Sequence, residues 1–186
     1  MELEKVKFQI SALFNRVSKL HDKEFEILPN VWEKLNDAHS AVMRCVIGFR
    51  QYPDFDRMDR DELEIYLKTA ELSEAQKDSM RDTNAKNNYY NKVITWKEIQ
   101  EAHEMFNRFH SYLVKNRIFL SADLKSKFDT IDQLMWEIWV KNKVGEESGA
   151  VEMKLEVIKK SDGPIKTLLV EIEDLVRSRL YPGTTM

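Results

Sequence analysis

The stretch from residue 95 to residue 120 constrains the fold most, because it carries a long helical pattern without a break. It contains neither Gly nor Pro. Apolar residues recur in it at steps of three and four, which is typical of a helix buried along one side. The face is broad, so we predict a central helix with several neighbours and expect its phenylalanines to lie in the main core: Ile99, Ala102, Phe106, Phe109 and Leu113, widened by Trp96, Met105 and Tyr112.

Most of the remaining chain repeats this helical periodicity, and no segment of any length shows the two-residue alternation of a strand. Five Gly and four Pro in 186 residues also leave few of the turn residues that a sheet protein needs. We therefore predict an all-α fold, an irregular bundle of about five to seven helices that forms a single domain over residues 1–186. Further helices are expected over residues 60–70, 122–143 and 151–180, the last broken by the sequence SDGP at residues 161–164.

Local sequence signals mark several helix ends. Asp59 suits the N-cap of the helix at residue 60, and SEAQ at residues 73–76 is a capping-box pattern that opens another. Ser121 is the expected cap of the helix that follows the central one. We expect the sequence GEESG at residues 145–149 to form a loop. The polar residues 82–91 form either a frayed connection or an exposed, asparagine-rich turn of a continuous helix.

A long first helix is predicted over residues 2–51, with one proline inside its pattern. Pro29 removes a backbone hydrogen bond and its ring crowds the preceding turn, at a cost of about 3 kcal/mol in a helix interior. We therefore expect a kink near residues 26–29, or two helices with Pro29 in the first turn of the second.

The first 23 residues carry a heptad seam and form a possible coiled-coil extension. Apolar side chains occupy every a and d position over nearly three heptads, until Glu24 takes the next a position. We predict that the protein is a homodimer in solution and that this seam is the self-association surface. The seam residues are Leu3, Val6, Ile10, Leu13, Val17 and Leu20.

The positions beside the seam bear on how it pairs. In a parallel homodimer Arg16 would lie near His21 of the second copy, which gains nothing and repels when the histidine is charged. Phe8 and Phe14 lie off the seam and need cover of their own. The segment therefore either pairs antiparallel or folds back on its own bundle, and we favour self-association.

Composition and charge exclude several classes of partner. The formal net charge is -3, so the chain has no general attraction for nucleic acid, and none is expected as a partner. The only cysteine, Cys45, lies in an apolar run and is predicted to be a buried thiol, which fits a reducing compartment. We see neither a signal peptide nor a run of about 18 apolar residues that could span a membrane. These features predict a cytoplasmic protein.

No motif for catalysis, metal binding or cofactor binding is present. Residues three before each of the four histidines are not carboxylates, so the Glu-x-x-His pairs of a di-iron bundle are missing. The sequence also lacks a Gly-rich phosphate loop, GxSxG, HExxH and paired CxxC. We expect no catalytic, cofactor or metal-binding residues. The remaining alternative is an enzyme with a cryptic site near His103, His110 and Arg117.

Each of these polar residues has a structural interpretation that we favour. His103 and His110 share a helix face and are expected at the edge of the core with one hydrogen bond each. At the end of the central helix, Arg117 should pair with a carboxylate while Asn116 bonds the backbone at the corner. Core packing is the favoured interpretation of the four tryptophans, Trp32, Trp96, Trp136 and Trp139.

Two stretches of the chain carry a resemblance. Residues 19–38, KLHDKEFEILPNVWEKLNDA, are similar to a run of the type KLxxEKEFEIYKELWEKL, and residues 105–124, MFNRFHSYLVKNRIFLSADL, to one of the type FNEFxxYxxKNRIYLPEEL. The chain thus resembles a widespread group of uncharacterised bacterial helical proteins. The resemblance implies a helical protein with an amino-terminal coiled coil, often behind a membrane helix, and no established catalytic activity. Pro29 departs from the pattern, and we expect no membrane helix within the chain as given.

These observations lead to one functional hypothesis and one alternative. The heptad seam and the lack of catalytic motifs favour a non-catalytic helical interaction or scaffold protein that self-associates and binds a protein partner. The alternative is a regulatory or antiphage-defence component, either a helical effector or an antitoxin-like inhibitor.

Overall fold

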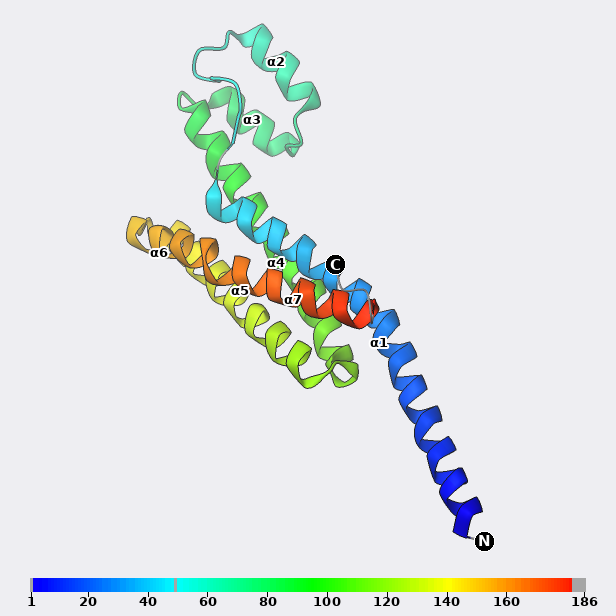
Figure 1. Cartoon of the computed structure of the whole chain (residues 1–186). Coiled ribbons are helices and arrows are strands. Elements are labelled where there is room, and N and C mark those ends of the chain that lie inside the picture. The colour runs from blue at the N-terminus through cyan, green and yellow to red at the C-terminus, as the bar shows by residue number, and fades with distance from the viewer. Residues whose placement is uncertain (1, 49, 182–186) are drawn as a thin grey trace.

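The computed structural model describes residues 2–48 and 50–181 and confirms the all-α prediction. No strand occurs in this part of the chain. Figure 1 shows a long first helix from which a bundle and a smaller helical cap branch. The elements in order are α1 (Glu2–Ile47), α2 (Arg60–Thr69), α3 (Glu74–Asp82), α4 (Lys86–Asn116), the 3₁₀ turn η1 (Arg117–Phe119), α5 (Ala122–Ser148), α6 (Val151–Asp162) and α7 (Pro164–Leu180).

The main core lies between the second half of α1 and helices α4 to α7. Phe106 and Phe109 of α4 lie within it, as predicted, and the Phe106 side chain is only 4% exposed. Helix α1 packs along α4, and α5 contacts both as well as α6 and α7. On α5 the core stripe uses Met135, whereas Leu134 is only partly buried beside it. The central helix is therefore covered from several sides, as its broad apolar face requires.

A second, smaller core joins α2 and α3 to the first turns of α4. Its centre is Phe55, which is fully buried and stacks edge-on with Tyr66 at 4.8 Å between ring centroids. Both short helices begin at the predicted caps: Ser73 forms the predicted capping box, and Asp59, predicted as an N-cap, forms a capping box as well. The break at residues 161–164 is also confirmed, because α6 ends at Asp162 and Pro164 opens α7. One helix, α4, thus serves both cores.

Pro29 lies inside a continuous helix, so the alternative of two separate helices is wrong. The proline is on the exposed side of α1, while its neighbours Ile27 and Leu28 are buried. The backbone carbonyl that loses its partner belongs to Phe25, whose side chain is also exposed. Water can reach this carbonyl, which lowers the cost of the missing bond. The tertiary packing of the following turns then keeps the helix intact.

The observed ends of α3, α4 and α5 decide three further predictions about loops and caps. The predicted loop at residues 145–149 is wrong, because α5 continues to Ser148 and buries Gly145. Only Gly149 leaves the helix, with a left-handed φ of 68° that glycine adopts without strain. Ser121 occupies the cap position of α5, but its side chain makes no capping bond. Of the asparagine-rich stretch, residue 82 ends α3, residues 83–85 connect the two helices, and residues 86–91 form the first turns of α4.

No helix in the described part of the chain combines the length and the apolar character that crossing a bilayer demands.

Candidate interaction surface

The heptad seam is exposed on a part of α1 that no other helix covers. Figure 1 shows these first turns projecting away from the bundle. All six seam side chains are exposed, from 47% for Val6 to 71% for Leu3. The segment therefore does not fold back on its own bundle, which was one of the two alternatives. Apolar side chains that are regularly spaced and uncovered over five turns form an unusual surface for a soluble helix.

The seam belongs to the same face of α1 that the bundle buries further along. After Leu20 the pattern continues through Glu24 and Ile27, and both of these side chains are buried. The other helices therefore bury this face of α1 from residue 24 onward and leave it exposed before that residue. The exposed seam is an uncovered continuation of the face that forms the core.

Glu24 marks the point where the bundle begins. Its side chain is only 7% exposed, and its Oε1 atom has no hydrogen-bond partner among the described residues. The Nε of Arg179, near the end of α7, lies 3.8 Å from Oε1, and the ring Nδ1 of His21 lies 4.0 Å from Oε2. A buried carboxylate at an a position stops the apolar seam, which sets the boundary of the exposed segment.

Two exposed phenylalanines lie off the seam on the same segment of α1. Phe8 is 76% exposed and Phe14 is 72% exposed. Counted in the same heptads, Phe14 lies at an e position beside the seam, whereas Phe8 lies at f on the opposite side. Only Phe14 can therefore be covered by a helix that pairs along the seam.

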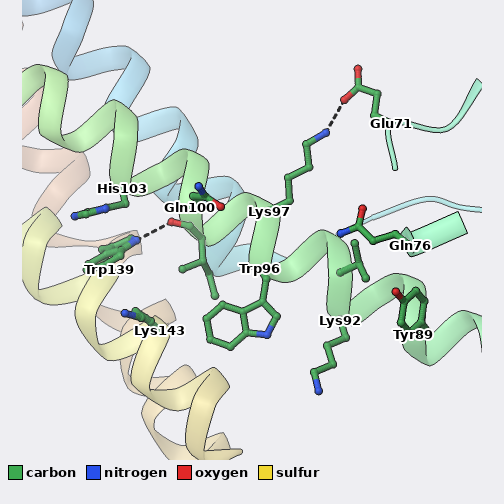
Figure 2. Close-up of a pocket in the computed structure, with 12 residues that line it drawn as sticks. Glu71, Gln76, Tyr89, Lys92, Trp96, Lys97, Gln100, His103, Trp139 and Lys143 are labelled. Carbon is green, nitrogen blue, oxygen red and sulfur yellow. Dashed lines mark hydrogen bonds and ion pairs between the residues drawn. The ribbon is translucent and has the colours of Figure 1, made fainter. Parts of the chain in front are cut away.

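A groove is present at the other end of the bundle, between α4, the second half of α5, and α3 with the loop before it. Its volume is about 720 Å³, and one stripe of α4 supplies most of its wall. Figure 2 shows the Trp96 ring pointing into the space between α4 and α5, with Lys143 and Lys92 on either side. The other lining residues that it labels are Glu71, Gln76, Tyr89, Lys97, Gln100, His103 and Trp139.

Trp139 is the fixed aromatic group of this groove. Its indole nitrogen donates to the backbone oxygen of Ile99 at 2.9 Å. The His103 ring stacks against it with centroids 4.4 Å apart and an angle of 15° between the planes. The ammonium of Lys143 lies 5.5 Å from the Trp139 ring centre, in a cation–π arrangement. These contacts hold Trp139 as part of the wall.

The three residues of the cryptic-site alternative each have a separate partner. His103 lies 3.1 Å from Asn107, and the Nδ1 of His110 donates to the Asp132 carboxylate at 2.9 Å. Burial of Asp132 raises its pKa, and this effect is larger than the opposing effect of the hydrogen bond from His110. Of the three residues, only His103 lines the groove.

The corner after α4 has the structure expected from its sequence. Arg117 pairs with Asp129 at 3.7 Å, and the Asn116 amide donates to the backbone oxygen of Tyr112 at 2.8 Å. The ion pair joins the corner to α5, whereas the Asn116 bond lies within the last turn of α4. The structure therefore confirms the structural interpretation of this pair of residues.

The tryptophans follow the core-packing prediction only in part. Trp139 is buried, and Trp32 and Trp96 are partly buried against the core. Trp136 is 43% exposed, so its assignment to the core is wrong. It lies over its neighbours Trp139 and Phe106, with ring centroids 5.2 Å and 5.7 Å away. On α5 it stands beside the buried stripe that runs through Met135 and Ile138, so its outer edge faces solvent.

An ion pair that sequence reasoning missed joins the segment after α1 to α4. The guanidinium of Arg50 contacts both carboxylate oxygens of Glu98 and donates to Asn91 at 2.8 Å and to Thr95 at 3.0 Å. Arg50 and Glu98 are each only 13% exposed. The hydrogen bond to Glu98 raises the pKa of Arg50 despite the opposing effect of burial. The partners are 48 residues apart, so no local spacing could have revealed them.

Cys45 is a buried free thiol, as predicted. Burial, followed by the nearby Glu98 carboxylate, raises the pKa of the Cys45 thiol to about 12. At neutral pH the reactive thiolate is therefore scarce. This residue is part of the core and not a nucleophile for the groove.

Comparisons with known proteins add no relative. No protein-family model, no curated protein and no solved structure matches the chain. Within residues 2–48 and 50–181, no three His, Cys, Asp or Glu side chains come together as a set that could hold a metal ion. The exposed seam and the groove are the two surface features of the described residues that could take a partner or a ligand.

Proposed function

We propose that the protein is a non-catalytic helical interaction protein that forms a homodimer through Leu3 to Leu20 of α1. The observation that carries the proposal is that burial of the side chains changes abruptly along one face of α1. That face is buried from Glu24 onward and exposed before it. Burying a large aliphatic side chain contributes about 1.5–3 kcal/mol, so six from each copy supply a substantial driving force. A second copy of the chain offers a matching seam.

The proposed arrangement is antiparallel. In one register every seam residue faces a seam residue of the second copy: Leu3 faces Leu20, Val6 faces Val17, and Ile10 faces Leu13. Shifting that register by one heptad in either direction leaves seam residues unpaired or sets Glu24 against Val6. An antiparallel pair in the first register therefore uses the whole seam.

The flanking residues also favour this arrangement. An antiparallel pair brings g positions together and e positions together, so Arg16 meets Gln9 and Lys7 meets Phe14 of the second copy. The lysine stem covers the phenylalanine ring, and its ammonium can lie over the ring face. The parallel arrangement instead sets Arg16 near His21. Antiparallel pairing thus removes this contact and covers Phe14.

Light scattering on the full chain tests the proposal. We expect a mass near twice the 22.0 kDa of one chain. The double substitution Ile10→Glu with Leu13→Glu places charges in the seam and should give a monomer. The matched control is Ser11→Glu with Asn15→Glu, which adds the same charge at exposed positions off the seam and should stay dimeric. A chain that begins at Lys23 should also be monomeric.

Two results would refute this proposal. A monomeric full chain at concentrations of tens of micromolar, about the range of modest helix pairing, removes the homodimer. A dimer that survives both seam charges places the interface elsewhere on the molecule. Either result would leave the fold of the bundle as described.

We infer two further properties that rest on the sequence. A reducing location such as the cytoplasm is supported by the single cysteine, which is buried as a free thiol. Membership of the bacterial helical group is supported by the two stretches at residues 19–38 and 105–124. Capture of a protein partner belongs to the same proposal, with the exposed α1 segment as the first surface to test.

A further inference from the structure

The groove beside Trp96 carries polar and aromatic groups that the packing of the fold leaves unused. The indole N–H of Trp96 has no hydrogen-bond acceptor among the described residues, and the ring lines open space. Lys92, one turn earlier on α4, has neither a hydrogen bond nor an ion pair within the described part. We propose that this groove binds a small ligand in which a planar aromatic ring is joined to an anionic group.

The aromatic part of the proposal rests on the difference between the two tryptophans. Trp139 already bonds the Ile99 carbonyl, and His103 and Lys143 lie against its ring. Trp96 has no ring partner of this kind, although it is partly buried and so held in place by the core. A tryptophan that is fixed at its base and open on one face is suited to stacking with a planar group.

The anionic part rests on the charges that line the groove. Three lysines, Lys92, Lys97 and Lys143, face a single carboxylate, Glu71. Lys97 is paired with Glu71 at 2.6 Å, and Lys143 forms a longer ion pair of 3.8 Å with Glu147, which lies outside the lining, so Lys92 is the lysine of the three for which no ion pair is found in the described part of the chain. The groove thus has an excess of positive charge in a chain whose net charge is -3. Lysine ammoniums bind phosphate or carboxylate as point charges.

The surface for stacking a ring and the positive charge for binding an anion lie next to each other in the groove. Figure 2 shows the Trp96 ring between Lys143 and Lys92, so a ring stacked on Trp96 would have a lysine of the same groove on either side for its anionic substituent. A volume of about 720 Å³ is sufficient for a ligand of the size of a mononucleotide. Gln100 and Tyr89 at the edge can supply hydrogen bonds. The ligand class is therefore defined by a ring and an anion on one small molecule.

Isothermal titration calorimetry on the full chain tests this inference with two probes that share the chemistry. Adenosine 5′-monophosphate carries a phosphate, and 2-naphthoate carries a carboxylate. We expect saturable binding of at least one, with adenosine and inorganic phosphate each binding at least about tenfold more weakly because each lacks one half. The stronger probe identifies the preferred anion. Failure of both probes to bind overturns the inference.

Variants then assign the site. Trp96→Leu keeps an apolar side chain against the core and should weaken binding by about tenfold or more, as should Lys92→Gln with Lys143→Gln. Lys115→Gln, at an exposed position near the far end of α4, is the matched control and should bind as the unmodified chain does. Circular dichroism confirms that each variant is folded. Binding that is unchanged in both groove variants places the ligand elsewhere and refutes the assignment.

One further binding measurement distinguishes a small-molecule site from a site for a macromolecule. A single-stranded oligothymidine also offers rings and phosphates. If the oligonucleotide binds through Trp96 while both small probes fail, the groove is a strand-binding surface and the proposal of a small ligand is wrong. Because none of these measurements depends on the seam, they remain informative for a monomer and for a dimer.

Discussion

At the scale of single residues, Phe106 tests the main core most directly. The side chain is 4% exposed, and it packs between the core and the Trp136 ring. Phe106→Ala should lower the free energy of unfolding by about 3–5 kcal/mol, from lost burial and from the cavity that remains. Chemical denaturation measures the change.

Phe8 provides the matched control for this substitution. It is 76% exposed and lies at an f position, away from both the core and the seam. Phe8→Ala should change the free energy of unfolding by no more than about 0.5 kcal/mol. If the two variants lose similar stability, α4 is not the organising helix of the core.

Residue environments could be predicted from the sequence where helical periodicity decides them. Phe106, Phe109 and Cys45 follow an apolar stripe, so their burial was predictable. Trp136 adjoins such a stripe, and the exposure of a residue beside a stripe depends on which neighbouring helix reaches it. The pairing of Arg50 with Glu98 depends on tertiary structure alone. The unused Trp96 face could not be predicted either, since it requires the positions of α3 and α5.

At the scale of elements, α1 combines a proline with an unbroken helix. Because Pro29 is exposed and the backbone around it is already helical, replacement by alanine should restore one hydrogen bond without a clash. Pro29→Ala should raise the free energy of unfolding by up to about 3 kcal/mol, the difference in helix propensity between the two residues. Thermal and chemical denaturation both report it.

A substitution at a second exposed position of α1 distinguishes the gain from removing a proline from the small gain in helix propensity that alanine brings at any exposed position. Ser40→Ala should give only about 0.5 kcal/mol, because Ser40 already donates its backbone hydrogen bond. A Pro29→Ala variant that is less stable than the unmodified chain would show that the proline shapes a bend that the packing of α1 needs.

Element boundaries could be predicted where side chains make the cap. The capping boxes at Asp59 and Ser73 and the break before Pro164 are local chemistry, and each is where the pattern placed it. The end of α5 was misjudged because Gly145 was taken as a helix stop. Packing against the bundle buries this glycine, and that tertiary contact overrides its low propensity.

At the scale of the whole molecule, the periodicity of the chain was sufficient for the all-α class but not for the division into two cores. The cap of α2 and α3 packs on α4 through tyrosines that are far apart in sequence, such as Tyr66 and Tyr90, whose hydroxyls lie 2.8 Å apart. The sequence also could not predict that the first turns of α1 project from the bundle. A heptad seam can be covered either by a second copy of the chain or by the chain's own bundle. The structure removes the bundle from these alternatives.

The arrangement of two molecules can be tested by disulfide formation along the seam. In the antiparallel register Ile10 faces Leu13 of the second copy, whereas in a parallel dimer each residue faces itself. Oxidation of Ile10→Cys alone or Leu13→Cys alone should therefore give no covalent dimer, and oxidation of a mixture of the two variants should give one. Two copies of the same position would be offset by three residues, about 4.5 Å along the axis, in addition to the separation of a directly facing pair, and this offset carries them beyond the reach of a disulfide.

The chain is well suited to this experiment because its own thiol does not compete. Burial raises the pKa of Cys45 to about 12, so at pH 8 the introduced cysteines carry nearly all of the thiolate. Ser11→Cys, exposed and off the seam, controls for collision between molecules and should not cross-link. Self-cross-linking of Leu13→Cys would establish a parallel dimer and refute the antiparallel arrangement. Absence of every cross-link in a chain that light scattering shows to be dimeric would place the interface outside the seam.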